Sequence, residues 1–128
     1  MILFGKKKTY RFRGTDKKVL SDEAHSEDYR NSEHIGRVCL GSLCFYYRDL
    51  GVRYWVPYDY IQRAFIRISE CPEDEFGNNQ HYFRLILVHD GKEFANLIFN
   101  EEKPVETVLQ RLALSYPHIA IGTENKRK

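Results

Sequence analysis

Residues 36 to 68 read "GRVCLGSLCFYYRDLGVRYWVPYDYIQRAFIRI" and decide the fold class. Short apolar and aromatic runs alternate here with turn-forming residues, a pattern typical of successive antiparallel strands. A two-residue turn at residues 41–42 pairs Val38 with Phe45 and places both on one face. The stretch therefore predicts a β-hairpin, followed by further strands of the same kind.

The next turn lies in "RDLGV", a three-residue connection in which Gly51 suits a positive φ. In the strand after it, Tyr54 and Val56 fall on the face that we assign to the core, and Trp55 falls on the other face. Pro57 lacks a backbone donor, so we expect the chain to bend or to leave the sheet there.

Trp55 is the only tryptophan of the chain. A large exposed indole is usually covered, so we expect Trp55 to lie in a contact. The sequence leaves three possibilities for what covers Trp55: a second copy of the chain, a partner, or the chain's own polar segment 14–34. We interpret the aromatic residues of 53–61 mainly as core or corner, with a base-stacking surface or a protein interface as alternatives.

Further strands are predicted over residues 61–69, 81–89 and 92–99. The last two flank Asp90-Gly91, the strongest two-residue hairpin signal. Apolar residues then recur with a period of 3.6, which predicts one amphipathic helix over residues 103–116, ended by Pro117. Residues 14–34 are polar and predict an irregular connection with one short helical turn.

The length of 128 residues indicates one domain. We expect residues 1–34 to form a basic N-terminal arm and polar connection, packed on or flanking a core at 35–121, with a loose tail at 122–128. The fold class is mainly β (α+β). We predict an antiparallel, partly closed barrel or bent sandwich of about six to seven strands, with the C-terminal helix over one open end.

The run at residues 36–68, the hairpin "LILVHDGKEFANLIF" at 85–99 and the terminal helix resemble the pleckstrin-homology-like superfamily, especially its small bacterial and GRAM-related members. The resemblance covers about residues 35–117. Its local phrase is "VPY", followed by Ile61 four residues after Pro57. It implies that the proline-aromatic step leads from one strand to the next around a barrel, with Val56 and Ile61 inside.

The first residues, "MILFGKKK", lack the apolar run of a signal peptide, and nothing later approaches the roughly 20 apolar residues of a membrane span. Three cysteines without a CxxC motif fit a reducing compartment. We therefore expect a soluble, cytoplasmic protein. The hairpin register places Cys39 opposite Cys44, so a disulfide or half of a metal site is a less favoured alternative to two buried thiols.

Catalytic signatures are not found in the sequence. There is no GxSxG, no phosphate-binding glycine loop, and no HxH or HExxH spacing among the five histidines. We predict no enzyme, no catalytic residue, no metal and no cofactor.

Basic residues carry the remaining functional signals. The stretch "KKKTYRFR" fits in letters the lysine-then-arginine-x-arginine pattern that lipid-binding pleckstrin-homology domains use for phosphoinositide headgroups, and its candidates are Lys6, Lys7, Lys8, Arg11 and Arg13. The alternative is that this stretch is a basic N-terminal arm exposed to solvent that binds no ligand. A second set contains only arginines, which favour planar, bidentate pairing, and it comprises Arg37, Arg48, Arg53, Arg63 and Arg67. Their alternative is pairing with the chain's own carboxylates.

From this second set we take Arg53, Arg63 and Arg67, with Trp55, as a possible anion or interface site. The net charge of +2 is small, which argues against a nucleic-acid partner. We predict a non-catalytic binding or assembly module that recognises a protein partner or forms a homo-oligomer. The alternatives are binding to an anionic membrane surface through the basic arm, and an enzyme with an unrecognised site.

Overall fold

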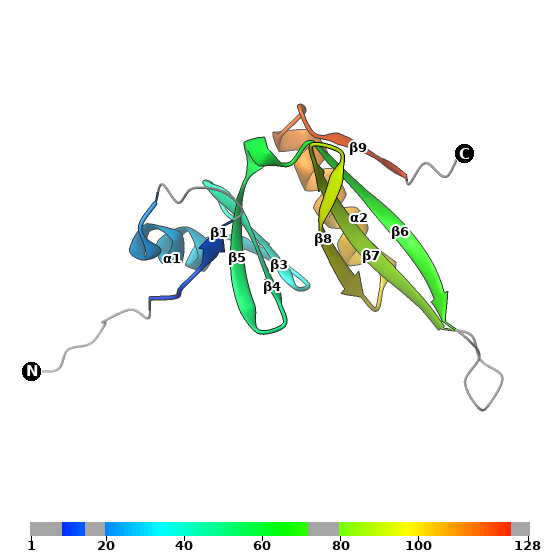
Figure 1. The fold of residues 1–128 in the computed structure, drawn as a ribbon, viewed down its shortest axis with the longest axis horizontal. Coiled ribbons are helices and arrows are strands. Elements are labelled where there is room, and N and C mark those ends of the chain that lie inside the picture. Colours follow the sequence, from blue (N-terminus) through cyan, green and yellow to red (C-terminus); the bar gives the residue numbers. More distant parts are fainter. Residues whose placement is uncertain (1–8, 15–19, 72–79, 124–128) are drawn as a thin grey trace, which may run out of the picture. The chain divides into compact units, whose positions relative to one another are not determined.

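The computed structural model describes residues 9–14, 20–71 and 80–123 (Figure 1). Lys6, Lys7 and Lys8 lie outside these residues. The contacts within the chain divide it into two compact units, residues 1–57 and 58–128, and each is described by itself.

The first unit contains a five-stranded sheet of order β1-β5-β4-β3-β2 and one helix (Figure 1). Its elements are β1 (Arg13–Gly14), α1 (Asp22–Arg30), β2 (Glu33–Ile35), β3 (Val38–Leu40), β4 (Cys44–Asp49) and β5 (Val52–Pro57). Strand β1 runs parallel to β5, and the other neighbours are antiparallel. The predicted antiparallel order therefore holds from β3 to β5, and β2 is a strand that the sequence did not predict.

The register of the first hairpin differs from the prediction by two residues. Phe45 pairs with Leu40 rather than Val38, and β3 and β4 are joined by the three residues 41–43, where the Gly41 N–H donates to the Cys44 carbonyl over 2.9 Å. The two-residue turn was wrong because the amides of this loop bind a side chain from α1, described below. An even shift leaves every residue on its predicted face.

Strands β4 and β5 are joined by a two-residue turn, since Asp49 pairs with Val52. Leu50 and Gly51 have φ values of +52° and +79°. The positive φ predicted at Gly51 is confirmed, whereas the predicted three-residue connection is one residue too long.

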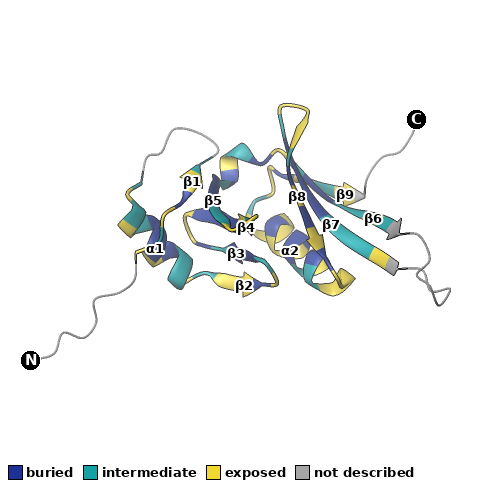
Figure 2. Cartoon of the chain, turned by 60° about the horizontal axis from the view of Figure 1, so that its bottom comes forward, coloured by how far each residue is buried: buried dark blue, intermediate teal, exposed yellow. Residues whose placement is uncertain are grey.

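Both faces of this sheet hold buried residues (Figure 2). Val56 is fully buried on one face, as predicted, and Trp55 is 1% exposed on the other. The indole of Trp55 packs against the N-terminal residues: the His25 ring of α1 lies 4.8 Å from it, between ring centroids, and a Cβ on Gly14 would overlap it. Of the three covers left open, the chain's own N-terminal segment is the one observed.

Helix α1 spans nine residues where the sequence predicted an irregular connection with only one short helical turn. Ser21 caps it by accepting from the Ala24 N–H over 3.1 Å, and Asp22 and Glu23 suit the positive end of its dipole. The helix was missed because its buried positions include polar residues, His25 and Ser26, so the apolar period is weak.

The second unit contains a four-stranded sheet of order β8-β7-β6-β9. Its elements are the 3₁₀ turn η1 (Tyr58–Tyr60), β6 (Arg63–Cys71), β7 (Gln80–His89), β8 (Lys92–Phe99), α2 (Glu102–Ser115) and β9 (Ala120–Thr123). The hairpin at Asp90-Gly91 is confirmed, because His89 pairs with Lys92. Helix α2 packs on this sheet through a buried stripe of Val105, Val108, Leu109 and Leu112.

The fold is mainly β, with two sheets and two α-helices. Among the described strands there is no closed barrel, and the finer prediction of a partly closed barrel or bent sandwich stays a prediction. Pro57 ends β5, η1 follows, and β6 pairs with β7 and, in parallel, with β9 instead of continuing the first sheet. A proline without an N–H donor is the physical reason for this break.

Candidate functional site

The chain segment that leads into β1 alternates between core and surface. Phe12 is buried, with its ring centroid 5.1 Å from that of Tyr46, while Arg11 and Arg13 are exposed on either side of it. Because successive side chains of an extended segment point to opposite faces, burying Phe12 directs both arginines outward.

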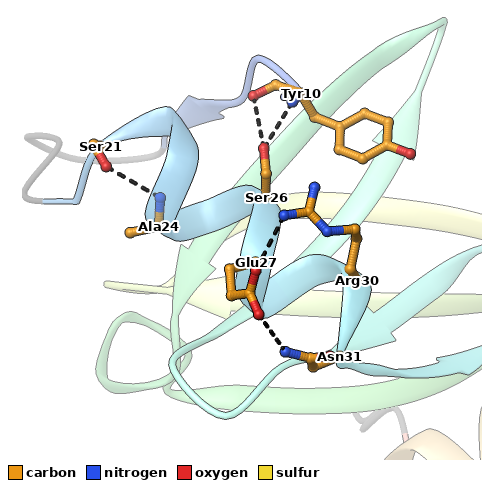
Figure 3. Close-up of polar contacts among 7 residues, drawn as sticks. All are labelled: Tyr10, Ser21, Ala24, Ser26, Glu27, Arg30 and Asn31. Carbon is orange, nitrogen blue, oxygen red and sulfur yellow. Dashed lines mark hydrogen bonds and ion pairs between the residues drawn. The ribbon is translucent and has the colours of Figure 1, made fainter. Parts of the chain in front are cut away.

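Two neighbours hold this segment in place. The Tyr10 N–H donates to Ser26 Oγ of α1 over 2.7 Å, and that hydroxyl lies 3.3 Å from the Tyr10 carbonyl oxygen (Figure 3). On the other side, Arg13 and Gly14 pair with Tyr54 and Trp55 of β5. The position of the arginines is therefore fixed by backbone contacts.

Arg11, Arg13 and Arg53 line one groove of about 350 Å³, together with Phe12 and Val52. We call this the arginine groove. It joins two of the residues predicted from the basic N-terminal stretch to one residue of the separate arginine set. Strand pairing between β1 and β5 brings them together, which no local sequence pattern could reveal.

The cations of the arginine groove are not neutralised internally. Within the described part of the chain, none of its three arginines forms an ion pair with a carboxylate. The Arg53 guanidinium carbon lies 4.3 Å from the centre of the Tyr10 ring, and its Nε is buried without a hydrogen-bond partner among the described residues. A guanidinium that packs over a ring keeps its positive charge and can still donate hydrogen bonds from its terminal N–H groups.

The other predicted arginines behave differently. Arg67 donates two hydrogen bonds to the Glu93 carboxylate, one of 3.1 Å from Nη1, and this is the pairing with an internal carboxylate that was weighed as its alternative. Arg63 lies over the Phe65 ring at 4.6 Å. Both belong to the second unit, and Trp55 is buried, so the structure does not gather the predicted anion or interface set within one unit.

A second hollow, of about 520 Å³, lies in the first unit. Its lining includes Tyr29 of α1, His34 of β2, Cys39 of β3, and Tyr47 and Arg48 of β4. Arg37, from the turn between β2 and β3, also lines it. The two hollows share no residue.

A buried carboxylate organises the same unit. Asp28 of α1 is 7% exposed and accepts hydrogen bonds from the backbone N–H groups of Ser42, Leu43 and Cys44, at 2.8 to 3.2 Å. The Tyr46 hydroxyl also donates to it, over 2.8 Å. Asp28 thus binds the β3–β4 loop to the helix, and this is the contact that lengthens the predicted turn.

His25 completes this buried polar group. Its Nδ1 lies 3.1 Å from the Tyr46 hydroxyl oxygen. Since that hydroxyl donates to Asp28, it accepts from His25, which requires the proton on Nδ1. Asp28, Tyr46 and His25 are buried and line neither of these two hollows, and their contacts join α1 to β4 within the core.

Cys39 and Cys44 are free thiols, and the disulfide alternative is not observed. Burial raises the pKa of Cys39, whose Sγ lies 3.3 Å from His34 Nδ1. Burial and then the charge of Asp28 raise the pKa of Cys44 to about 11. Both thiols therefore stay protonated at neutral pH. Within residues 9–14, 20–71 and 80–123, no three His, Cys, Asp or Glu side chains lie close enough to hold a metal.

No helix in the described ranges is both long and apolar enough to cross a membrane. No family model, curated protein or solved structure matches the chain.

Sequence reasoning found the arginines but missed their arrangement, and it missed Asp28 and His25 altogether. The signal that existed was Ser21 followed by two acidic residues, a helix start that would have placed Asp28 inside a helix. Nothing in the sequence indicates that its carboxylate is enclosed by a loop fourteen residues later.

Proposed function

We propose that this chain is a non-catalytic binding module whose arginine groove recognises an anionic group. The observation that carries the proposal is the convergence of Arg11, Arg13 and Arg53 on one groove with no internal carboxylate among the described residues. Guanidinium groups bind phosphate and carboxylate oxygens in a bidentate manner, so three of them suit a multiply charged group.

A phosphorylated headgroup at an anionic membrane surface is the ligand that we favour. The lysines of residues 6–8 come three to five residues before Arg11 in the sequence and add positive charge to the same stretch of chain. A basic residue near an anionic surface contributes about 1 kcal/mol, so the groove and the lysines together are enough for salt-dependent, reversible attachment.

The membership in the pleckstrin-homology-like superfamily is part of this proposal. Its support is the element order: seven strands, β2 to β8, follow one another with antiparallel pairing inside each sheet, and α2 comes next. Recognition of a partner or a ligand is what this resemblance implies, and a non-catalytic role and a cytoplasmic location are carried over from the sequence as part of the proposal. The groove differs from the sequence expectation in one respect, because it includes Arg53 of β5.

Vesicle co-sedimentation tests the proposal. The full chain is mixed at low salt with phosphatidylcholine vesicles, with vesicles that also contain phosphatidylserine, and with vesicles that contain a phosphoinositide. We expect enrichment on the anionic vesicles, strongest on the phosphoinositide, and loss of enrichment as salt rises. Competition by free inositol trisphosphate separates headgroup recognition from general attraction to the surface.

The matched variants are Arg11→Gln/Arg13→Gln and, as a control with the same change of charge, Lys92→Gln/Lys103→Gln at exposed positions of the second unit. We expect the first pair to abolish sedimentation and the second to leave it nearly unchanged. Equal loss of sedimentation in both double variants would mean that net charge alone causes the binding. No enrichment of the wild-type chain on anionic vesicles would reject the proposal.

Self-association is a second candidate, because one observation favours it. Strand β8 is eight residues long and has a strand neighbour on one side only, among the strands that the structure describes. Such an edge can add a strand from a second copy. Light scattering that gives a dimer mass, lost on Ala95→Pro in β8 while the variant stays folded, would support it, and a strict monomer would reject it.

A further inference from the structure

The turn between β4 and β5 carries an apolar side chain at its tip. Leu50 and Gly51 form this turn at one end of the first sheet (Figure 1). Leu50 is 96% exposed, more than any other large apolar residue that the structure describes. A single exposed leucine is ordinary on a protein surface, so its exposure alone indicates no function.

The backbone of this turn makes leucine an unfavourable residue at its tip. Leu50 and Gly51 both have positive φ, at +52° and +79°. A two-residue hairpin turn with two positive φ values favours Asn or Asp at its first position and Gly at its second. In this left-handed conformation the Cβ of a leucine crowds its own backbone, which Gly avoids and Asn or Asp tolerates. Leu50 is therefore unfavourable for the conformation of the turn as well as for its exposure.

The second hairpin of the chain shows the favoured residue in the same kind of turn. Asp90 and Gly91 join β7 to β8 with φ values of +54° and +74°, close to those of Leu50 and Gly51. A polar residue thus holds the position in that turn that Leu50 holds in this one. Neither the turn conformation nor packing within the chain explains the leucine, which indicates a contact outside the chain.

Two arginines flank the tip. Arg48 of β4 and Arg53 of β5 are directly opposite each other, one pair away from the turn. Like charges at opposite positions repel, and neither arginine forms an ion pair with a carboxylate among the described residues. The carboxylate of Asp49, at the turn itself, lies 3.7 Å from the Arg37 guanidinium. The flanks of the tip are therefore positively charged.

The arginine groove lies at the same end of β5. Val52 and Arg53 directly follow the turn and line the groove. Strand β1 runs parallel to β5 with Arg13 opposite Tyr54, so Arg11, two residues earlier, lies toward the turn and lines the groove beside Val52. An apolar tip and an anion-binding groove thus occupy one end of the first sheet.

We infer that Leu50 inserts into an anionic lipid bilayer while the arginine groove holds a headgroup. This inference rests on the proposed function and adds that the anion belongs to a membrane rather than to a dissolved molecule. Two residues of a strand measure about 6.6 Å, which matches the roughly 5 to 10 Å between the phosphate level and the upper acyl chains. With Leu50 at the acyl chains, Arg48 and Arg53 reach the phosphates.

Leu50→Asn is the variant that tests the inference, in the full chain. Asn is a favoured residue at this position, so the unfolding midpoint should stay at or above that of the wild type. Affinity for vesicles that contain a phosphoinositide should fall about tenfold, because burial of a leucine side chain is lost. Affinity for free inositol trisphosphate should stay within about twofold, since no arginine of the groove is changed.

Leu43→Asn is the matched control. Leu43 is 54% exposed and directly precedes β4, whereas Leu50 directly follows it, so the two leucines lie at opposite ends of one strand. The control removes the same apolar side chain from the same sheet. Its affinity for vesicles should stay within about twofold of the wild type, because the end of β4 that carries Leu43 faces away from the bilayer.

A second measurement locates the tip in the bilayer. The wild-type chain is bound to bicelles of phosphatidylcholine and phosphatidylserine in which one lipid carries a nitroxide on its acyl chain. We expect the amide signals of Leu50 and Gly51 to broaden. The amide signals of Asp90 and Gly91, in the matching turn of the second hairpin, should keep their intensity.

The inference is overturned if Leu50→Asn binds vesicles as the wild type does, or if it loses inositol trisphosphate to the same extent as vesicles. Attachment to bicelles without stronger broadening at Leu50 than at Asp90 would also overturn it and would leave a protein partner as the contact of the leucine. A wild-type chain that binds inositol trisphosphate but no vesicle would overturn the insertion and keep the anion site. A chain that binds neither would reject both.

Discussion

Asp28 of α1 accepts hydrogen bonds from four groups of the first unit. A buried carboxylate is costly unless its oxygens are satisfied, and here three backbone N–H groups and the Tyr46 hydroxyl satisfy them. The carboxylate is therefore a structural anchor between α1 and the β3–β4 loop.

Asp28→Asn should lower the free energy of unfolding by about 2 to 4 kcal/mol, because the amide NH₂ would face backbone donors and the charge-assisted bonds would be lost. Urea unfolding measures this change in the free energy of unfolding. The control is Glu27→Gln, one residue away and exposed, which should change stability by no more than about 0.5 kcal/mol. Equal effects of the two variants would contradict the role given to Asp28.

Cys44 should make stability fall at alkaline pH. Its folded pKa of about 11 lies above the reference value of 9.0, so the folded state keeps the proton that the unfolded state loses. The stability that Cys44 contributes by keeping its proton is fully present below about pH 9 and is lost as the pH rises toward 11. Unfolding midpoints measured from pH 8 to 11 should drop more steeply for wild type than for Cys44→Ala. Parallel curves would contradict the raised pKa.

Strand β1 is only two residues long, so its attachment depends on close packing at Gly14. A Cβ there would overlap the Trp55 indole, a rigid ring that cannot easily move. The contact sets the position of Arg11 and Arg13 beside Arg53, because these residues lie in the same short segment.

Gly14→Ala should destabilise the first unit by about 1 to 3 kcal/mol through overpacking, and it should change the fluorescence of Trp55. It should also weaken anion binding, although no arginine is altered. Gly122→Ala in β9 is the control, because a Cβ there meets nothing within 4 Å. If Gly14→Ala kept wild-type stability and wild-type affinity, the close packing of β1 on β5 would be wrong.

At the scale of the whole molecule, the sequence predicted local features better than long-range ones. The hairpin at Asp90-Gly91 and the positive φ of Gly51 follow from two-residue chemistry and are confirmed. The pairing of distant strands was not predicted, because no local pattern indicates that β6 pairs with β9, more than fifty residues later in the chain. The sequence also left undecided which segment packs over Trp55, because that contact joins residues far apart in the chain.

In the candidate site, too, the sequence predicted local features better than long-range ones. The letter pattern of residues 6–13 named Arg11 and Arg13 as candidates, but their meeting with Arg53 depends on the parallel pairing of β1 with β5. No periodicity in the sequence encodes that pairing. The internal partner of Arg67 is likewise set by the register of three neighbouring strands.

The most direct test of the central claim, that the arginine groove binds an anion, is a backbone-amide NMR titration with inositol trisphosphate at low salt. We predict saturable shifts at residues 11–14 and 52–54, weaker binding as salt rises, and loss of the shifts in Arg11→Gln/Arg13→Gln but not in Lys92→Gln/Lys103→Gln. Absence of saturable shifts at these residues in the wild-type chain, or equal shifts in both double variants, would contradict the claim.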